Sequence, residues 1–512
     1  MNNRKNIIRE LIEPLLENED INLDQLKRKI CKKYAVKEFI KNSEILKELK
    51  KQKKLNKNLL LKLKKAPSRT ISGVTPVAVM SFSGCPHSGC IYCPRGKNAA
   101  QSYTGEEPAA MRAKQNNFDA WKQVKTRLKQ YKCMGHPSDK CELIIMGGTF
   151  LSNKEKYKRS FIKGCFDAFN NKKSRNLKEA QKLNEKVKHR IIGLTIETRP
   201  DYVNIDEMLS YGCTRIELGV QVLSDKIYKK VNRGHTLKDV INATKKCKEA
   251  GLKITYHIMP GLFQTPKQDI KMFKELFSNP DFKPDMLKIY PTLVMKNTKL
   301  YEIWEKGEYK PYTAKEAAEV ISECYKYIPN YVRIMRVQRD IPTPFITAGV
   351  EKSNLRQIVE ENCIKKKIKI KEIRHREAGL QKYDFKKNSK NIKLKIKKYL
   401  ASKGIEYFIS FEDTKKDVLI GFIRLRICEN KKAIIRELHV YGSEIGLSKE
   451  QQDSTNSSVQ HKGYGKRLLK KAEEIAKKQG TKKLFVISGI GVREYYYKLG
   501  YSLDGFYVSK VL

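Results

Sequence analysis

The sequence predicts an α/β chain with two folded modules and a helical, basic N-terminal segment, and three observations carry this prediction. At 512 residues the chain is longer than one ordinary domain. From residue 67 to 338, short apolar runs alternate with amphipathic stretches. From residue 391 to 512 a second series of short strands begins, after a charged, proline-containing connector over residues 339–390. The first 66 residues carry helical spacing and many lysines.

The N-terminal segment is expected to be helical because its apolar residues, from Ile7 to Leu16, recur at helical intervals. Up to Ala66 it holds 19 Lys and Arg against 9 Asp and Glu, a net charge of +10, and the whole chain has a net charge of +50. An excess of one sign favours a polyanionic partner, usually nucleic acid. The lysines of the segment could instead form a solvated helix face, and the charge of the whole chain could instead reflect a lysine-rich genome.

No segment of the sequence approaches the roughly 20 apolar residues that span a bilayer. The first 20 residues also mix charged and apolar side chains, unlike a signal peptide. We therefore expect a soluble, cytoplasmic protein.

The first module should contain a parallel sheet. Helical stretches such as Leu237–Ala250, which Gly251 ends, separate most of its candidate strands. Alternating strands and helices imply right-handed crossovers, and six or seven such units predict a full or partial β/α barrel with its chemistry at the C-terminal strand ends. The candidate strands are Pro76–Phe82, Leu143–Met146, Ile191–Glu197, Arg215–Val220, Lys253–Met259, Met286–Tyr290 and Val332–Val337.

A cysteine triplet follows the first candidate strand. Cys85, Cys90 and Cys93 form a C-x4-C-x2-C pattern in a loop with Gly and Pro. Structural zinc usually takes four protein ligands, and the chain has no second C-x2-C pair, although His87 is an available fourth ligand. Three cysteines on a four-iron cluster leave one iron open to a substrate. We therefore favour a [4Fe-4S] cluster over zinc.

Two glycine-containing turns indicate close approach of the backbone to a ligand. Gly147 and Gly148 follow the second candidate strand, where the absence of a side chain admits a neighbour. Gly463 and Gly465 open a predicted helix over residues 463–478, and successive N–H groups at such a helix start suit a pyrophosphate.

Two family resemblances rest on these motifs. The cysteine loop, with Tyr92 before its last cysteine and Gly147-Gly148 beyond it, resembles radical-SAM enzymes, whose usual spacing is C-x3-C-x2-C. The C-terminal order of strand, glycine loop, helix, strand and tyrosine-rich helix resembles the α+β GCN5-related N-acetyltransferase (GNAT) domain. Together they resemble the catalytic acetyltransferase subunit of Elongator in its stand-alone archaeal form. Matching strings include Thr195–Tyr202, Asn232–Thr236, Leu287–Val294 and Arg336–Pro342.

The resemblance implies an acyltransferase that carboxymethylates C5 of the wobble uridine in tRNA. Cleavage of S-adenosylmethionine would give a radical that takes hydrogen from the acetyl methyl of acetyl-CoA, and the carbon radical would add to the base before thioester hydrolysis. The implied cofactors are a [4Fe-4S] cluster, S-adenosylmethionine and acetyl-CoA as co-substrate. The implied partners are a tRNA anticodon stem-loop and an electron donor, and a need for accessory Elongator-type subunits stays open.

The resemblance also assigns site residues. Cys85, Cys90 and Cys93 would hold the cluster, and Lys288 and Tyr496 would take part in catalysis. Lys288 interrupts an apolar run, so we expect it to face the reaction chamber; for the tyrosines, packing alone is the alternative. The expected cofactor contacts are Lys140, Gly147, Gly148, Glu437, Leu438, His439, Val440, Gln460, Gly463, Tyr464, Gly465, Lys466, Tyr495 and Tyr496.

Two rival functions stay open from the sequence. The C-terminal module alone would support a protein lysine acetyltransferase with Glu437 as general base, and the charge alone would support a tRNA-binding scaffold without catalysis. Many relatives carry cysteines in the connector, but the corresponding Ile370–Glu377 has none, which argues against zinc there.

Overall fold

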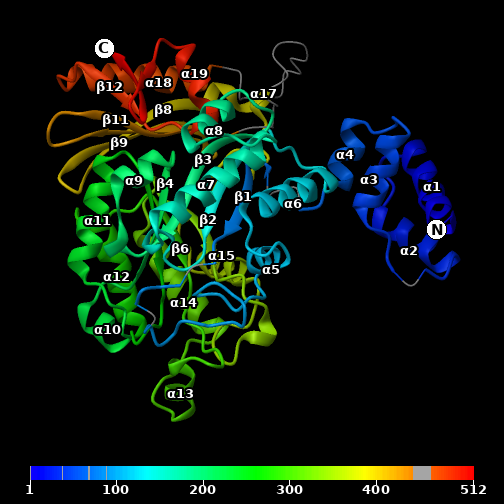
Figure 1. The fold of residues 1–512 in the computed structure, drawn as a ribbon, viewed down its shortest axis with the longest axis horizontal. Coiled ribbons are helices and arrows are strands. Elements are labelled where there is room, and N and C mark those ends of the chain that lie inside the picture. The colour runs from blue at the N-terminus through cyan, green and yellow to red at the C-terminus, as the bar shows by residue number, and fades with distance from the viewer. Residues whose placement is uncertain (1, 37, 67–69, 83, 88, 442–462) are drawn as a thin grey trace.

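The computed structural model describes residues 2–36, 38–66, 70–82, 84–87, 89–441 and 463–512. It consists of an N-terminal helical unit, a barrel built on a parallel sheet and a C-terminal mixed sheet (Figure 1). This arrangement confirms the predicted fold class. Among the described helices, none is both long and apolar enough to cross a membrane.

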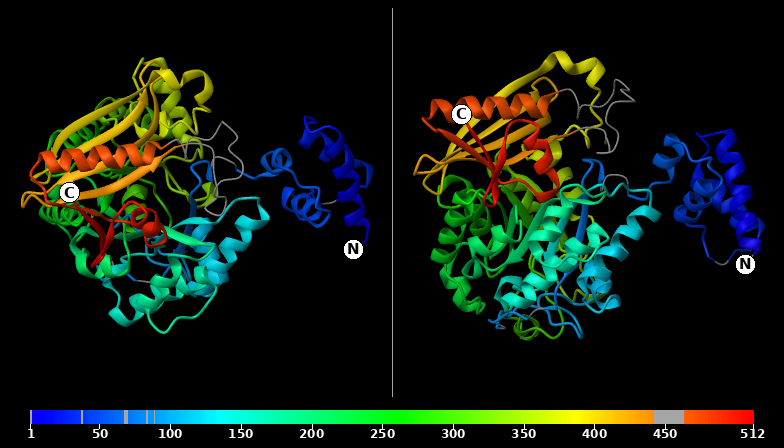
Figure 2. Two further views of the ribbon diagram at one scale, coloured as in Figure 1. Left: turned by 90° about the horizontal axis from the view of Figure 1, so that it is seen from above. Right: turned by 45° about the horizontal axis from the view of Figure 1, so that its top comes forward.

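The N-terminal unit has an apolar core of its own, which explains why it stands to one side of the barrel (Figures 1 and 2). Leu11, Leu15, Ile45 and Leu49 are fully buried in this core. Helix α3 contacts the barrel helix α6, so the unit is attached at the edge of the first module. Its helices are α1 (Asn2–Glu17), α2 (Leu23–Lys33), α3 (Asn42–Lys51) and α4 (Lys57–Leu63).

The barrel sheet is parallel and its strands follow one another in chain order from β1 to β7. Among the described residues the two edge strands do not pair with each other, so the barrel is open on one side. The strands match the apolar runs of the sequence: β1 (Thr75–Met80), β2 (Lys140–Met146), β3 (Arg190–Thr198), β4 (Arg215–Gln221), β5 (Lys253–Ile258), β6 (Met286–Ile289) and β7 (Arg333–Val337).

Helices cover the outside of this sheet, as right-handed crossovers require. They are α5 (Pro108–Gln115), α6 (Ala120–Cys133), α7 (Glu155–Asn170), α8 (Leu177–Asn184), α9 (Ile205–Ser210), α10 (Asp225–Lys230), α11 (Leu237–Glu249), α12 (Pro266–Ser278) and α14 (Ala314–Cys324). Helix α13 (Lys299–Glu305) instead projects away from the sheet at the bottom of Figure 1. The residues taken as a connector contain α15 (Leu355–Lys365), α16 (Ile373–Arg376) and α17 (Phe385–Asn388). Because α15 packs on α14 through buried Val359 and Cys363, it extends the barrel layer.

The C-terminal sheet has the order β13-β14-β12-β11-β10-β9-β8. Its long strands are β8 (Ile392–Ala401), β9 (Gly404–Asp413), β10 (Val418–Ile427) and β11 (Ala433–Val440), followed by α18 (Tyr464–Lys478), β12 (Lys483–Val486) and α19 (Arg493–Tyr497). Strands β11 and β12 pair in parallel only from Ala433 to Ile435, and β11 then continues to Val440 paired with β10 but not with β12. The sheet therefore splays at this point. The terminal hairpin of β13 (Ser502–Asp504) and β14 (Tyr507–Val511) was not among the predicted strands.

The C-terminal sheet lies against the N-terminal ends of the barrel strands (Figures 1 and 2). A Cβ on Gly489 would lie 2.1 Å from the Ile192 carbonyl oxygen, so the two backbones are in close contact. Arg436 of β11 reaches across the interface, and its guanidinium contacts both carboxylate oxygens of Asp285 at 2.5 and 2.8 Å. The C-terminal sheet therefore leaves the opposite end of the barrel, where the strands have their C-terminal ends, uncovered.

Candidate functional site

The three cysteines of the triplet line one cavity at the C-terminal strand ends of the barrel. All three are free thiols and half-buried. Each sulfur faces a hydrogen-bond donor from another part of the module: Thr149 Oγ1 lies 3.4 Å from Cys85, Arg233 Nη1 lies 3.6 Å from Cys90, and Gln101 Nε2 lies 3.1 Å from Cys93. Donors aimed at sulfur stabilise thiolates, which are the metal-binding form.

This donor set fits an iron–sulfur cluster. Three cysteine sulfurs that each face a hydrogen-bond donor match a [4Fe-4S] site in which one iron stays open to a substrate. His87 Nε2 lies 2.7 Å from the carbonyl oxygen of Asn232. That nitrogen therefore carries a proton, which leaves Nδ1 as the one nitrogen of His87 with the lone pair that a metal needs.

The glycine pair after β2 brings backbone to the rim of the same cavity. Gly147 has φ 111°, and a Cβ there would lie 2.4 Å from the carbonyl oxygen of Ser81 at the end of β1. Gly148 has φ 55° and lines the cavity beside Thr149. Both positions therefore require glycine for the backbone path, and their contact with S-adenosylmethionine stays a prediction.

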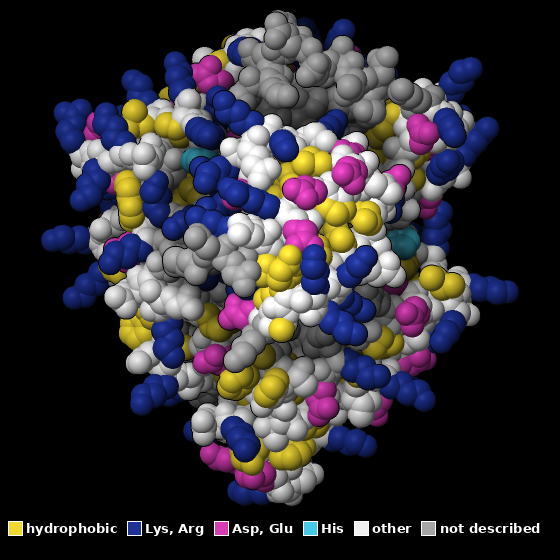
Figure 3. All heavy atoms as spheres, turned by 90° about the vertical axis from the view of Figure 1, so that its right-hand side faces the viewer, with side chains coloured by type: hydrophobic (Ala, Val, Ile, Leu, Met, Phe, Trp, Pro, Cys, Tyr) yellow, Lys and Arg dark blue, Asp and Glu magenta, His cyan; other side chains and the backbone are white. Residues whose placement is uncertain are grey.

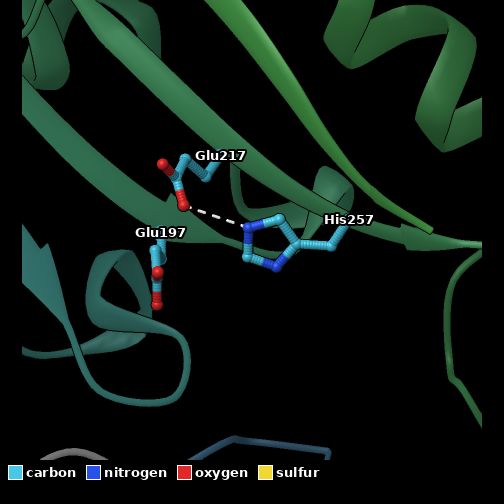
Figure 4. A group of neighbouring side chains, drawn as sticks. All are labelled: Glu197, Glu217 and His257. Atoms are coloured by element: carbon cyan, nitrogen blue, oxygen red, sulfur yellow. Dashed lines mark hydrogen bonds and ion pairs between the residues drawn. The ribbon is translucent and has the colours of Figure 1, made fainter. Parts of the chain in front are cut away.

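A layer of titratable side chains from the barrel strands lines the same cavity, and Figure 4 shows three of them, Glu197, Glu217 and His257. The Lys288 ammonium on β6 contacts the carboxylates of Glu217 on β4 and, at 3.3 Å, of Glu197 on β3. His257 Nε2 on β5 lies 3.0 Å from Glu217. Tyr103 donates to Glu197 at 2.9 Å. Lys288 thus faces the chamber, as its place in an apolar run suggested.

The electrostatic surroundings of Lys288 and Glu217 keep both side chains charged. Burial alone would raise the pKa of the Glu217 carboxyl, but Lys288 and the hydrogen bond from His257 hold it well below its ordinary value. Burial would likewise lower the pKa of Lys288, but Glu217, Tyr290 and Glu197 outweigh burial and raise it. At neutral pH the pair is an ammonium and a carboxylate.

Glu197, Glu217 and His257 also form a metal-type group, since their ligand atoms lie within 4.8 Å of one another. The Lys288 ammonium bonds to both carboxylates and occupies the place that a cation would take. The protein therefore already supplies a positive charge at this place, and we do not assign a metal site to these three residues.

A second cavity lies between the splayed C-terminal sheet and the N-terminal ends of the barrel strands. Glu437, Leu438 and His439 of β11 line it, as does Tyr496 of α19. Tyr496 is only 6% exposed, and burial raises its pKa. It therefore keeps its phenolic proton, and its role toward acetyl-CoA stays a prediction.

The other predicted acetyl-CoA residues form the rim of the splay. Gly463 adopts φ 77° as the N-cap of α18. A Cβ on Gly465 would lie 3.0 Å from the hydroxyl of Tyr495 and 3.9 Å from Val440, so these three residues come together.

Three further predicted contacts have different surroundings. Tyr464 packs on Phe411 at a ring distance of 5.0 Å, whereas Lys466 is exposed. Lys140 begins β2, two residues before Glu142 of the cavity wall. Gln460 lies outside the described residues.

Glu437 is poorly suited to act as a general base. Arg424 Nε lies 2.8 Å from its carboxylate. Burial favours the neutral acid, but Arg424 and Lys253 outweigh it and lower the pKa of Glu437. A carboxylate held in this way has little tendency to take a proton.

Sequence reasoning missed two sets of residues. The first set is the donors to the cysteine sulfurs: Arg199 and Arg233 come from segments far along the chain, with Arg199 Nη1 3.9 Å from Cys85, whereas Gln101 stands only eight positions after Cys93. The partners of Lys288, Glu197 and Glu217, could have been found, because each is a charged side chain inside an otherwise apolar strand.

Four family models match the chain: the ELP3 N-terminal domain at residues 1–71, the Radical SAM superfamily at 79–277, the Radical_SAM C-terminal domain at 284–365 and the Acetyltransferase (GNAT) family at 374–501. Radical-SAM and GNAT domains bind a [4Fe-4S] cluster with S-adenosylmethionine and acetyl-CoA respectively, which confirms the predicted cofactors.

The chain is similar to the tRNA uridine(34) acetyltransferase of Methanocaldococcus infernus, with 49% identity over 492 residues, 92% of this chain and 91% of that one. It is also similar to the human Elongator complex protein 3, with 40% identity over 531 residues, 99% of this chain and 96% of that one. Among solved structures, the archaeal Methanocaldococcus infernus Elp3 with an N-terminal deletion matches with a TM-score of 0.76 and 46% identity, over 86% of this chain and 100% of that chain.

Proposed function

The chain belongs to the family of Elongator complex protein 3 and the tRNA uridine(34) acetyltransferases, and from this premise we propose that it transfers a two-carbon unit from acetyl-CoA to C5 of the wobble uridine of tRNA, giving 5-carboxymethyluridine. The observation that carries the proposal is the pair of cavities at opposite ends of one barrel. One is lined by the cysteine triplet and the other by the splayed acetyltransferase strands.

The residues of this chain divide the work between the two cavities. Cys85, Cys90 and Cys93 hold the cluster, which when bound supplies the electron for cleavage of S-adenosylmethionine. In the second cavity, the start of α18 at Gly463 offers backbone N–H groups to the pyrophosphate of acetyl-CoA. Tyr496 lines the same cavity and keeps its proton because burial raises its pKa, so it would be available as a proton donor to the thioester when acetyl-CoA is bound.

The basic surface supports the tRNA partner. Lys and Arg side chains are spread over most of the face on the side of the N-terminal helices, with acidic side chains scattered among them (Figure 3). Such a surface grips phosphates with an affinity that falls steeply with salt. We take the anticodon stem-loop as the bound element, since an unpaired loop base can be turned into a pocket, and the cytoplasm as the location.

The deciding experiment is anaerobic reconstitution with iron and sulfide, followed by incubation with tRNA, S-adenosylmethionine, dithionite and methyl-labelled acetyl-CoA. We expect label in a C5-carboxymethyl-type uridine of the digested tRNA, and only when both S-adenosylmethionine and acetyl-CoA are present. Label in protein alone, or an intact cluster without label in RNA, would contradict the proposal.

A protein lysine acetyltransferase is the rival function, and the geometry disfavours it. Its general base would be Glu437, whose carboxylate is held by Arg424 at 2.8 Å with a lowered pKa. It would also leave the cysteine cavity without a role. Acetyl transfer to a peptide in the absence of S-adenosylmethionine would favour this rival.

A further inference from the structure

The two cavities meet inside the barrel. Glu217, Lys288 and Arg336 line the cysteine cavity and also line the acetyltransferase cavity. They come from strands β4, β6 and β7 of the barrel sheet, and because they border both cavities their side chains lie between the two spaces. Inside the barrel, the two cavities are therefore separated by a layer of charged side chains that borders both.

Polar contacts run through this layer from one cavity to the other. On the acetyltransferase side, Arg215 Nη2 lies 2.8 Å from Glu142 and 3.6 Å from Glu217. Glu217 contacts Lys288, and Lys288 contacts Glu197, which lines only the cysteine cavity. The interior thus has the polar lining that a polar acyl group requires, whereas an apolar barrel core would exclude one.

We propose that the acetyl unit reaches the radical site through the barrel interior, and that the Lys288–Glu217 ion pair is the gate that separates the two cavities. The proposal rests on the function proposed above and adds the route of the acyl group to it. The species that passes is an acyl group with an oxygen acceptor, either the thioester on its pantetheine arm or free acetate.

The surroundings of Lys288 explain how the gate opens without leaving a bare charge. The ammonium has two carboxylate partners, Glu197 at 3.3 Å and Glu217, so it can release Glu217 while it stays paired with Glu197. The acyl oxygen then accepts the hydrogen bond that Glu217 has given up. Breaking a buried pair outright leaves an uncompensated charge, and an exchange of partners avoids most of that cost.

Lys288 is a gate and not a covalent carrier of the acetyl group. Acylation of its nitrogen would require the neutral amine, but Glu217, Tyr290 and Glu197 raise the pKa of Lys288 above its ordinary value and keep it protonated. The group therefore acts as a hydrogen-bond donor.

Gly193 offers a place to block the passage with little damage to the fold. It lies on β3 beside Glu142 and lines the acetyltransferase cavity. A Cβ there would meet Thr214 Oγ1 at 3.4 Å and Glu142 Cγ at 3.8 Å, which are ordinary contacts. A larger side chain would extend into the passage. Gly193→Leu is the blocking variant, and Gly193→Ala is its matched control.

The test uses full-length enzyme and acetyl-CoA with a deuterated methyl group. Deuterium in 5′-deoxyadenosine reports that the acetyl methyl has met the radical, and labelled uridine reports the complete reaction. Affinity for acetyl-CoA is measured separately at equilibrium, without a reaction. We expect Gly193→Leu to lower deuterium transfer and labelled uridine at least tenfold, with affinity and total 5′-deoxyadenosine within twofold of wild type, and Gly193→Ala to resemble wild type.

Two results would overturn the proposal: deuterium transfer by Gly193→Leu at the wild-type level, or a loss of acetyl-CoA affinity that accounts for the lost transfer. Labelled acetate added in place of acetyl-CoA identifies the species, since deuterium transfer from acetate would mean that the free acid passes. If the wild-type enzyme labels no uridine, the proposed function fails, whereas deuterium transfer by the wild type still allows the passage to be tested.

Discussion

Asp285 joins the two modules, and its replacement by asparagine should destabilise the whole chain. The side chain is fully buried. It accepts two hydrogen bonds from Arg436 of the C-terminal sheet, at 2.5 and 2.8 Å, and one from the backbone of Ile254 at 2.9 Å. Arg424 and Lys248 lie 3.6 and 4.0 Å from the same carboxylate. Asparagine keeps the shape but removes the charge that these cations share.

The expected size of the effect follows from these contacts. Each hydrogen bond between charged groups contributes about 1.5–3 kcal/mol, so two give roughly 3–6 kcal/mol. Arg436 keeps Glu406 at 3.1 Å and the Leu252 carbonyl at 2.8 Å, which limits the loss. We therefore expect Asp285→Asn to lower the free energy of unfolding by about 3–5 kcal/mol, the range for a broken buried pair.

Urea unfolding followed by circular dichroism measures this loss. Asp281→Asn is the matched control, since Asp281 is partly exposed four positions earlier and should change stability by less than about 0.5 kcal/mol. Asp285→Asn combined with Arg436→Met should recover part of the loss, because the unpaired cation is removed with its partner. A loss below about 1 kcal/mol, or a double variant as unstable as the sum of the two, would refute the reasoning.

Three further predictions concern single side chains. Cys90→Ala should abolish the cluster absorbance and uridine modification but retain tRNA binding, and loss of binding would indicate structural zinc. Tyr496→Phe should slow thiol release from acetyl-CoA about 10²-fold with unchanged iron content; an unchanged rate would defeat its role. Burial raises the pKa of Asp269 to about 7. The native state then holds a proton that the unfolded state releases, so the stability that this group contributes is lost as pH rises towards 7. The urea midpoint of Asp269→Asn should therefore depend less on pH, between pH 5 and 8, than that of the wild type.

The strands of the barrel and the cysteine triplet could be predicted because their signals are local. A buried parallel strand is a continuous apolar run, and the seven runs of the sequence became β1 to β7 with ends shifted by a few residues. The triplet needs only one loop of nine residues. The glycines of both turns were likewise visible, and Gly147 and Gly463 take positive φ values, a conformation that glycine adopts most readily.

The donors to the thiolates could not be predicted, because they depend on how distant segments come together. Arg233 stands 143 positions from Cys90, and Thr149 stands 64 positions from Cys85. Nothing in the spacing of either residue marks a neighbour of sulfur. The C-terminal hairpin was missed for a simpler reason: β13 has only three residues, too few for an alternating pattern.

The charged layer of the barrel could be predicted only in part, and it bears most directly on function. Lys288, Glu197 and Glu217 were each visible as a charge in an apolar strand, but their contact with one another depends on the register of strands β3 to β6. Buried ion pairs are commonly no more stable than apolar residues of the same volume, so stability alone does not account for this layer. A hydrophobic plug would also seal the barrel permanently. An ammonium between two carboxylates seals it reversibly, because a polar acyl group can replace one partner. The layer is therefore better explained by passage between the two cavities than by support of the fold.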